Sequence, residues 1–131
     1  MRKDIDIPEV KGVFVAAIYT YNVAFKEDEW NAYVINDNNE PIETVLIVST
    51  GSKNDKKSST IRHKIDVLPA KSFSKIEMLT DDLININNQF SVSYFHGSKM
   101  YHKDFIFKAG TIKESSTQKI PLIGEQGILA E

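Results

Sequence analysis

The amino-acid sequence predicts an all-β protein, an antiparallel β-sandwich of about seven strands with at most one short helical turn. Apolar residues alternate with a period of two along several segments, which is typical of strands rather than helices. Clusters of Gly, Pro, Asn, Asp and Ser lie between these segments, and short strands that recur about every 8–12 residues with such turns are typical of sandwiches and barrels. The chain of 131 residues has no internal repeat and is expected to form a single domain, residues 1–131.

Three segments in the first half of the chain carry apolar residues on both faces, which predicts strands inside the sheets. They are residues 12–21, 29–37 and 43–51. Trp30, on the second segment, is expected in the core because it alternates with the outward positions.

The fourth segment, residues 59–68, has one apolar and one charged face, which predicts a half-buried strand. The apolar face carries Ile61, His63, Ile65 and Val67. Segments 72–79, 89–96 and 100–108 complete the set of strands.

The dipeptide Gly97-Ser98 predicts a two-residue type II′ turn, because glycine tolerates the positive φ that the first position requires. This turn places Tyr94 directly opposite Tyr101 on one face of the hairpin. The other, wetter face then carries Ser91, Ser93, His102 and Asp104.

Polar segments between the strands are expected to be loops, a hairpin loop at 27–29 and a longer one at 51–59. Helical character is expected only at 80–86. There Thr80 or Asp81 can cap one or two turns, and Asp81 and Asp82 lie where the helix dipole favours acids.

Residues 109–131 are first polar and then apolar, and the stretches "IPLIG" and "GILAE" are too hydrophobic for a free tail. This C-terminal segment is expected to dock on the sandwich core, residues 12–108, or on a second copy of the chain. The residues expected at that interface are Ile120, Leu122, Ile123, Ile128 and Leu129.

The composition of the chain excludes several classes of function. The net charge of -2, from 16 basic and 18 acidic residues, gives none of the basic excess of nucleic-acid binders. The absence of cysteine excludes disulfides, thiolate zinc sites and a cysteine nucleophile. The start "MRKDIDIPEV" lacks the apolar core of a signal peptide, and no run approaches the roughly 18 apolar residues of a membrane helix. A cytoplasmic location without membrane contact is expected if Met1 is the native start.

Few side chains could take part in catalysis or bind a metal. His63, His96, His102 and Asp104 would form a ligand or metal site if the strands brought them together, although none of their spacings is typical of zinc motifs. His102 and Asp104 also have the spacing of a base and its orienting acid, but the chain has no Gly-x-Ser-x-Gly elbow. The sequence therefore predicts no catalytic residue, cofactor or bound metal.

Two stretches resemble an immunoglobulin-like sandwich of the cysteine-free kind found in many bacterial modules. In "YVINDNNEPIETVLIVS" an Asn near the end of one strand precedes a short acidic turn and a valine-rich strand. In "IDVLPAKSFSKIE" a strand ends in Leu-Pro-x-x-Ser and another strand leaves it. The resemblance covers residues 12–108 and implies a fold rather than an activity. The Cys…Trp…Cys spacing of antibody domains is absent.

The whole chain also resembles a family of small uncharacterised bacterial proteins, whose members often carry the name phosphoribosylpyrophosphate synthetase. That name implies a phosphate-and-metal site at the acidic pair of "MLTDDLININNQF". Enzymes of that type have a Gly/Thr-rich loop after the pair, whose amides cradle pyrophosphate. This sequence has no such loop after Asp82.

The expected function is that of a non-enzymatic interaction module, which binds a protein partner or another copy of itself through an open sheet edge. The alternative is a small-ligand-binding or enzymatic domain, related to phosphoribosyl pyrophosphate or a metal, with a pocket at one end of the sandwich. Its lining would come from His63, His96, Tyr94 or Tyr101 and the acids near 81. Exposed tyrosines would also suit a carbohydrate-binding module.

Overall fold

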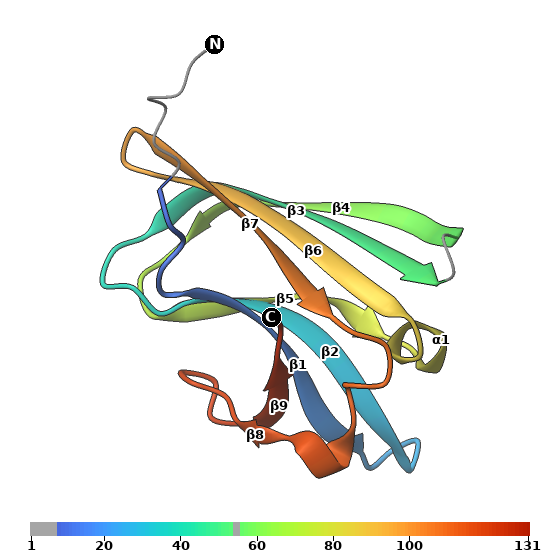
Figure 1. The fold of residues 1–131 in the computed structure, drawn as a ribbon. Coiled ribbons are helices and arrows are strands. Elements are labelled where there is room, and N and C mark those ends of the chain that lie inside the picture. The colour runs from blue at the N-terminus through green and yellow to red at the C-terminus, as the bar shows by residue number, and fades with distance from the viewer. Residues whose placement is uncertain (1–7, 54–55) are drawn as a thin grey trace.

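A computed structural model of the chain describes residues 8–53 and 56–131. The predicted fold class is confirmed, because the described strands form two antiparallel sheets packed face to face (Figure 1). The predicted strands are β1 (Val13–Asn22), β2 (Glu27–Asn36), β3 (Ile42–Lys53), β4 (Lys56–Leu68), β5 (Ser72–Leu79), β6 (Asn87–His96) and β7 (Lys99–Phe107).

The C-terminal segment adds two short strands, β8 (Gln118–Lys119) and β9 (Gln126–Leu129). Within the described residues, one sheet has the order β5-β2-β1-β9-β8 and the other the order β4-β3-β6-β7. Strands β1, β2 and β3 therefore each have two neighbours, as their two apolar faces predict. Helical structure in the described part of the chain consists of one turn, α1 (Asp81–Ile84), and a 3-10 turn, η1 (Glu114–Ser116).

The main core lies between the two sheets, because alternate side chains of each strand point inward. Trp30 belongs to this core, as predicted, and its ring centroid lies 5.1 Å from that of Tyr19. A second, smaller core lies on the outer face of β1 and β2, where Ala16, Ile18 and Ile35 pack against Ile120 of the C-terminal segment.

The C-terminal segment lies against β1 and then crosses to the other sheet (Figure 1). Ile128 of β9 lies opposite Ala17 of β1 in antiparallel register. Glu131 and Ile106 of β7 then exchange two backbone hydrogen bonds, each 3.0 Å long. The segment consequently covers one side of the sandwich and links both sheets.

Two loop predictions are wrong. Strand β2 begins at Glu27, so residues 27–29 are paired strand residues and the hairpin loop is residues 23–26. Most of the predicted loop at 51–59 is also strand, since β3 runs to Lys53 and β4 begins at Lys56; residues 54–55 lie outside the described residues. At the first place polar composition misleads because Glu27 and Asp28 are strand residues whose side chains are exposed to water.

Strand β4 is an edge strand, with β3 as its neighbour on one side. Ile65 on its predicted apolar face packs against the main core, but Ile61 and Val67 on the same face stay exposed. The face is therefore covered only in part, since an edge strand has a neighbouring strand on one side only.

Candidate functional site

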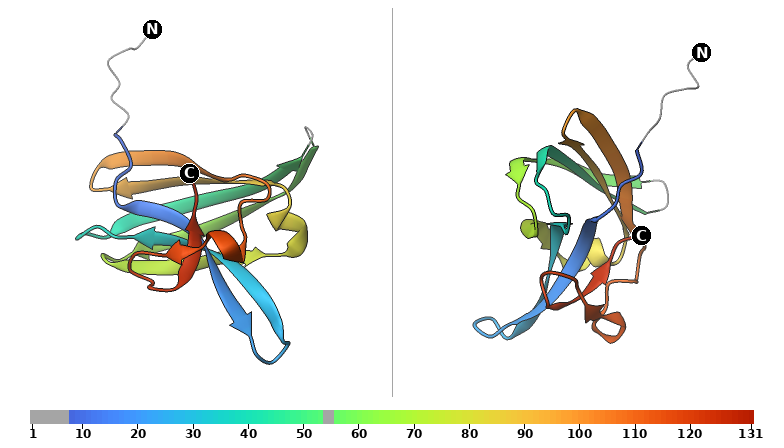
Figure 2. Two further views of the ribbon diagram at one scale, coloured as in Figure 1. Left: turned by 60° about the horizontal axis from the view of Figure 1, so that its bottom comes forward. Right: turned by 90° about the vertical axis from the view of Figure 1, so that its left-hand side faces the viewer.

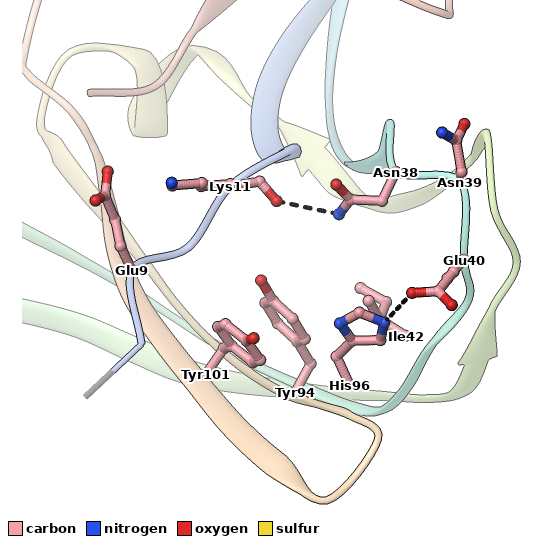
Figure 3. Close-up of a pocket in the computed structure, with 9 residues that line it drawn as sticks. All are labelled: Glu9, Lys11, Asn38, Asn39, Glu40, Ile42, Tyr94, His96 and Tyr101. Carbon is pink, nitrogen blue, oxygen red and sulfur yellow. Dashed lines mark hydrogen bonds and ion pairs between the residues drawn. The ribbon is translucent and has the colours of Figure 1, made fainter. Parts of the chain in front are cut away.

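A cavity of about 530 Å³ lies at one end of the sandwich (Figure 3). Three parts of the chain line this end pocket: the segment before β1, the turn between β2 and β3, and the hairpin of β6 and β7. These parts are far apart in the sequence and meet only because β2, β3, β6 and β7 end on the same side.

The floor of the end pocket is aromatic. The two-residue turn places Tyr94 opposite Tyr101, as predicted, and Gly97 has the expected positive φ of 65°. The two tyrosine rings stack nearly parallel, with centroids 5.1 Å apart and planes inclined by 4°. The ring of His96, on the same face, lies 6.3 Å from the Tyr101 ring.

The Tyr94 hydroxyl is the unusual group of the end pocket. Tyr94 as a whole is only 3% exposed, and its hydroxyl, which makes no hydrogen bond to any residue that the structure describes, opens into the cavity. Figure 3 shows it pointing into the space between the segment before β1 and the β2–β3 turn. Burial, together with the neighbouring Tyr101, raises the pKa of Tyr94 to about 12, so the hydroxyl keeps its proton at neutral pH.

The buried side chain of Asn36 shapes one wall of the end pocket. Its Oδ1 accepts a hydrogen bond from the Asn38 backbone N–H at 3.1 Å, and its Nδ2 donates to the Glu40 carbonyl at 3.0 Å. Asn38 in turn donates to the Lys11 carbonyl at 3.0 Å, which fixes the segment before β1 against the turn. The His96 Nε2 lies 2.7 Å from Glu40 Oε1, so the turn is also tied to β6.

Three further polar side chains of the end pocket have no partner among the described residues. The Glu9 carboxylate, the Lys11 ammonium and the Asn39 amide form no hydrogen bond or ion pair with residues 8–53 and 56–131. Sequence reasoning identified Tyr94, Tyr101 and His96 but missed these three, since no local signal connects them to the hairpin.

His63 lies elsewhere, between the sheets and away from the end pocket. Its Nε2 is 3.0 Å from Glu77 Oε1 on β5, and the Ser49 hydroxyl donates to the same oxygen at 2.8 Å. His63 is half-buried with a satisfied partner, and this cluster links β3 and β4 of one sheet to β5 of the other.

His102 and Asp104 lie on the outer face of the β6–β7 hairpin, as the turn predicts. The Ser93 hydroxyl is 2.7 Å from His102 Nδ1, and His102 Nε2 is 3.0 Å from Asp104 Oδ1. The Ser91 hydroxyl donates to that same Asp104 oxygen at 2.7 Å. The His102 and Asp104 side chains are about half exposed. Ser93 lies on β6, an inner strand whose backbone N–H groups are used for hydrogen bonds within the sheet, so the cluster lacks the oxyanion donors of a hydrolase.

The three histidines therefore lie in three separate places. His96 and His102 point to opposite faces of one hairpin, and His63 lies between the sheets. In the described part of the chain, no His, Asp and Glu side chains form a group of three that would hold a metal ion.

Asp81 and Asp82 are first-turn residues of α1, preceded by Thr80 in extended conformation. Both aspartates are exposed, and Asp81 lines a hollow with the acidic residues 27–29 of β2. Such a surface repels phosphate. The acidic pair is thus a helix start between β5 and β6, as the helix dipole predicts.

The predicted interface residues of the C-terminal segment have different environments. Ile120 is fully buried, Ile123 and Leu129 pack on the smaller core, and Ile128 packs on the main core. Leu122 is instead exposed, in a turn where its φ is 71°.

An apolar surface that sequence reasoning missed lies at the end of the β1–β2 hairpin. Tyr21, Val23 and Phe25 are 54%, 77% and 73% exposed, and together we call them the hairpin tip. Figure 2 shows this end of the hairpin extending away from the rest of the sandwich. The signal in the sequence is "NVAFK", a turn with two large apolar residues where polar residues are usual.

The fold defines an all-β sandwich with a pocket at one end. A scan against protein-family models, a search of curated proteins and a search of solved structures each found no match for the chain. Of the helices in the described residues, none has the length and apolar character needed to cross a membrane.

Proposed function

We propose that this protein is a non-enzymatic interaction module, which binds a protein partner through the hairpin tip. The observation that carries the proposal is the exposure of Val23 and Phe25, the two most exposed large apolar side chains among the described residues. Burying two such side chains in a partner would supply most of the binding energy, because a few apolar anchors dominate most interfaces.

A side-chain hydrogen bond closes the loop of the hairpin tip. The Asn22 side-chain oxygen accepts a hydrogen bond from the Phe25 backbone N–H at 3.1 Å, which closes the turn. Lys26 completes the turn with a positive φ of 54°. A preformed loop loses little conformational entropy when it binds.

Acidic residues lie at the base of the hairpin tip and indicate which charge the partner surface should carry. Glu27, Asp28 and Glu29 follow the loop directly. Hydrogen bonds from Asn31 and then Asn22 lower the pKa of Glu29, so its charge persists under mildly acidic conditions. The matching partner surface is an apolar pocket with a basic rim, and an anionic membrane would be repelled. The partner is a different protein or a second copy of this chain.

Strand order supports an immunoglobulin-like assignment within this proposal. The order β4-β3-β6-β7 corresponds to the C′-C-F-G arrangement of immunoglobulin sheets, and β1-β2-β5 corresponds to A-B-E. The absence of cysteine suits the reducing cytoplasm, where we place the protein.

Site-specific photocrosslinking in the native cell tests the proposal. A photoreactive amino acid replaces Phe25 in the full chain, and a matched chain carries it at Met100, another exposed apolar residue, on β7. We expect one discrete adduct from position 25, lost when Val23→Ser is added, and none from position 100. Equal adducts at both positions, or an adduct that survives Val23→Ser, would contradict the proposal. Sedimentation of the purified chain shows whether the partner is a second copy.

A second function is favoured by a separate observation, the unpaired Tyr94 hydroxyl in the end pocket. This hydroxyl faces the open space of the cavity, where a bound molecule would be within reach of a hydrogen bond. We therefore propose small-ligand binding in the end pocket as the alternative role of the module. A polyanion such as phosphoribosyl pyrophosphate is the less suitable ligand, because Glu9 and Glu40 line the same cavity.

A further inference from the structure

The free polar groups of the end pocket include both donors and acceptors. Lys11 offers only N–H donors, Glu9 offers only acceptor oxygens, and the Asn39 amide and Tyr94 hydroxyl offer both. A ligand that satisfies them all must itself donate and accept within a small volume.

The charges of the end pocket exclude strongly charged ligands. The carboxylates of Glu9 and Glu40 repel an anion, while the Lys11 ammonium repels a cation. Glu40 Oε1 lies 2.7 Å from His96 Nε2, and Glu9 and Lys11 bring opposite charges to the same cavity. The preferred ligand is therefore electrically neutral overall.

The aromatic floor adds a flat apolar surface. Tyr94 is buried beneath its stacked partner, whereas Tyr101 is partly exposed and the His96 side chain is 41% exposed. The face open to the cavity accordingly belongs mainly to Tyr101 and His96. Such a surface suits a ring with an apolar C–H face.

From this combination we infer that the end pocket binds a neutral sugar residue, an inference that rests on the small-ligand function proposed above. A pyranose ring has a C–H face for Tyr101, and its rim of hydroxyls can each donate and accept. Those hydroxyls would bond to Tyr94, Glu9, Lys11 and Asn39. The cavity of about 530 Å³ falls in the usual size range of small-molecule sites.

Nuclear magnetic resonance titration of the full, isotope-labelled chain tests the inference. The probes are glucose, galactose, mannose, N-acetylglucosamine, cellobiose and lactose. Two probes of other chemistry run beside them, glycine as a zwitterion and inorganic pyrophosphate as an anion. We expect at least one sugar to give saturable shifts at millimolar concentration in the amides of the β6–β7 hairpin and the β2–β3 turn.

Conservative variants locate the site without disturbing the fold. Tyr94→Phe removes one hydroxyl that has no described partner and should weaken sugar binding about tenfold, the usual effect of losing one hydrogen bond. Glu9→Gln should weaken it by a smaller factor while the melting temperature stays unchanged. Tyr33→Phe, which packs on the smaller core on the outer face of β2, is the matched control and should leave the affinity unchanged.

The possible outcomes test separately whether the end pocket binds a ligand and whether that ligand is a sugar. Shifts at the same amides from glycine or pyrophosphate, without any from the sugars, would refute sugar binding but support the end pocket as a ligand site. An absence of shifts with every probe would overturn the sugar and remove the support for the small-ligand function. Sugar binding that is equally strong in Tyr94→Phe would place the sugar elsewhere and refute the inference.

Discussion

The side-chain Nδ2 of Asn36 lies 3.1 Å from the backbone oxygen of Leu68, in a fully buried position. Asn36 ends β2 in one sheet, and Leu68 ends β4 in the other. The same Nδ2 also lies 3.0 Å from the carbonyl oxygen of Pro69. One side chain thus holds together the β2–β3 and β4–β5 turns.

Replacing Asn36 by Ala should destabilise the protein strongly. The change leaves buried carbonyls without donors, so we expect the free energy of unfolding to fall by roughly 2–4 kcal/mol. Urea unfolding followed by tryptophan fluorescence measures this change. Asn39→Ala, in the same turn but without a described hydrogen bond, is the control and should change stability by less than about 0.5 kcal/mol. Equal midpoints for the two variants would show that Asn36 does not hold the turns.

Gly127 should tolerate no side chain. A Cβ at this position would overlap the carbonyl oxygen of Ala17 and lie 2.9 Å from the Ile120 side chain. Gly127→Val should therefore separate β9 from β1 and lower the free energy of unfolding by about 1–3 kcal/mol. Hydrogen exchange should show faster exchange of the β9 amides in this variant. The control is Gln126→Val, which places a β-branched residue at the exposed neighbouring position and should keep β9 protected.

Removing residues 111–131 should expose the smaller core. Ile18 and Ile35 would lose the cover that Ile120 provides, and such a patch destabilises the fold or drives association. We expect a lower melting temperature or a larger species in gel filtration. Leu122→Ser in the full chain changes only an exposed residue of the segment and should behave like the original protein. A truncated chain with the melting temperature and elution volume of the full one would contradict the docking role.

Alkaline titration should reveal two tyrosines that ionise late. Burial raises the pKa of Tyr94 to about 12, and hydrogen bonding to Asp28, followed by desolvation and a bond to Glu114, raises that of Tyr19 further. Unfolded tyrosine ionises near pH 10, so between about pH 10 and 12 the native state keeps protons that the unfolded state has lost. Their stabilising effect is complete below about pH 10 and is lost as the pH rises through the native pKa values.

Phenolate absorbance measures this difference directly. Native protein should show a late component that disappears in denaturant, and Tyr94→Phe and Tyr19→Phe should each remove part of it. The double variant should also lose less stability over this pH range. If native and denatured protein titrate alike, neither hydroxyl is perturbed.

The features that could be predicted from the sequence are those set by interactions between residues close together in the chain. The two-residue turn at Gly97 sets the β6–β7 register, so the pairing of Tyr94 with Tyr101 was predictable, as were the opposite faces of His96 and His102. Period-two alternation likewise identified the strands. Both signals are local, because neighbouring positions on a strand determine each face.

Long-range contacts explain what could not be predicted. His63 reaches Glu77 across the two sheets, and Glu9 meets the hairpin only because distant strands end on one side. The paired residues 27–29 were misjudged as a loop for a related reason, since their partners in β1 cannot be recognised from charge alone.

The sequence by itself therefore determined the class of the fold, its strands and one complete hairpin, since alternation and turn chemistry act over a few residues. Only the tertiary structure decided which side chains share the end pocket, where the C-terminal segment lies and which apolar residues stay exposed at the hairpin tip. Those features depend on how the two sheets pack, and packing brings together residues that no local pattern connects.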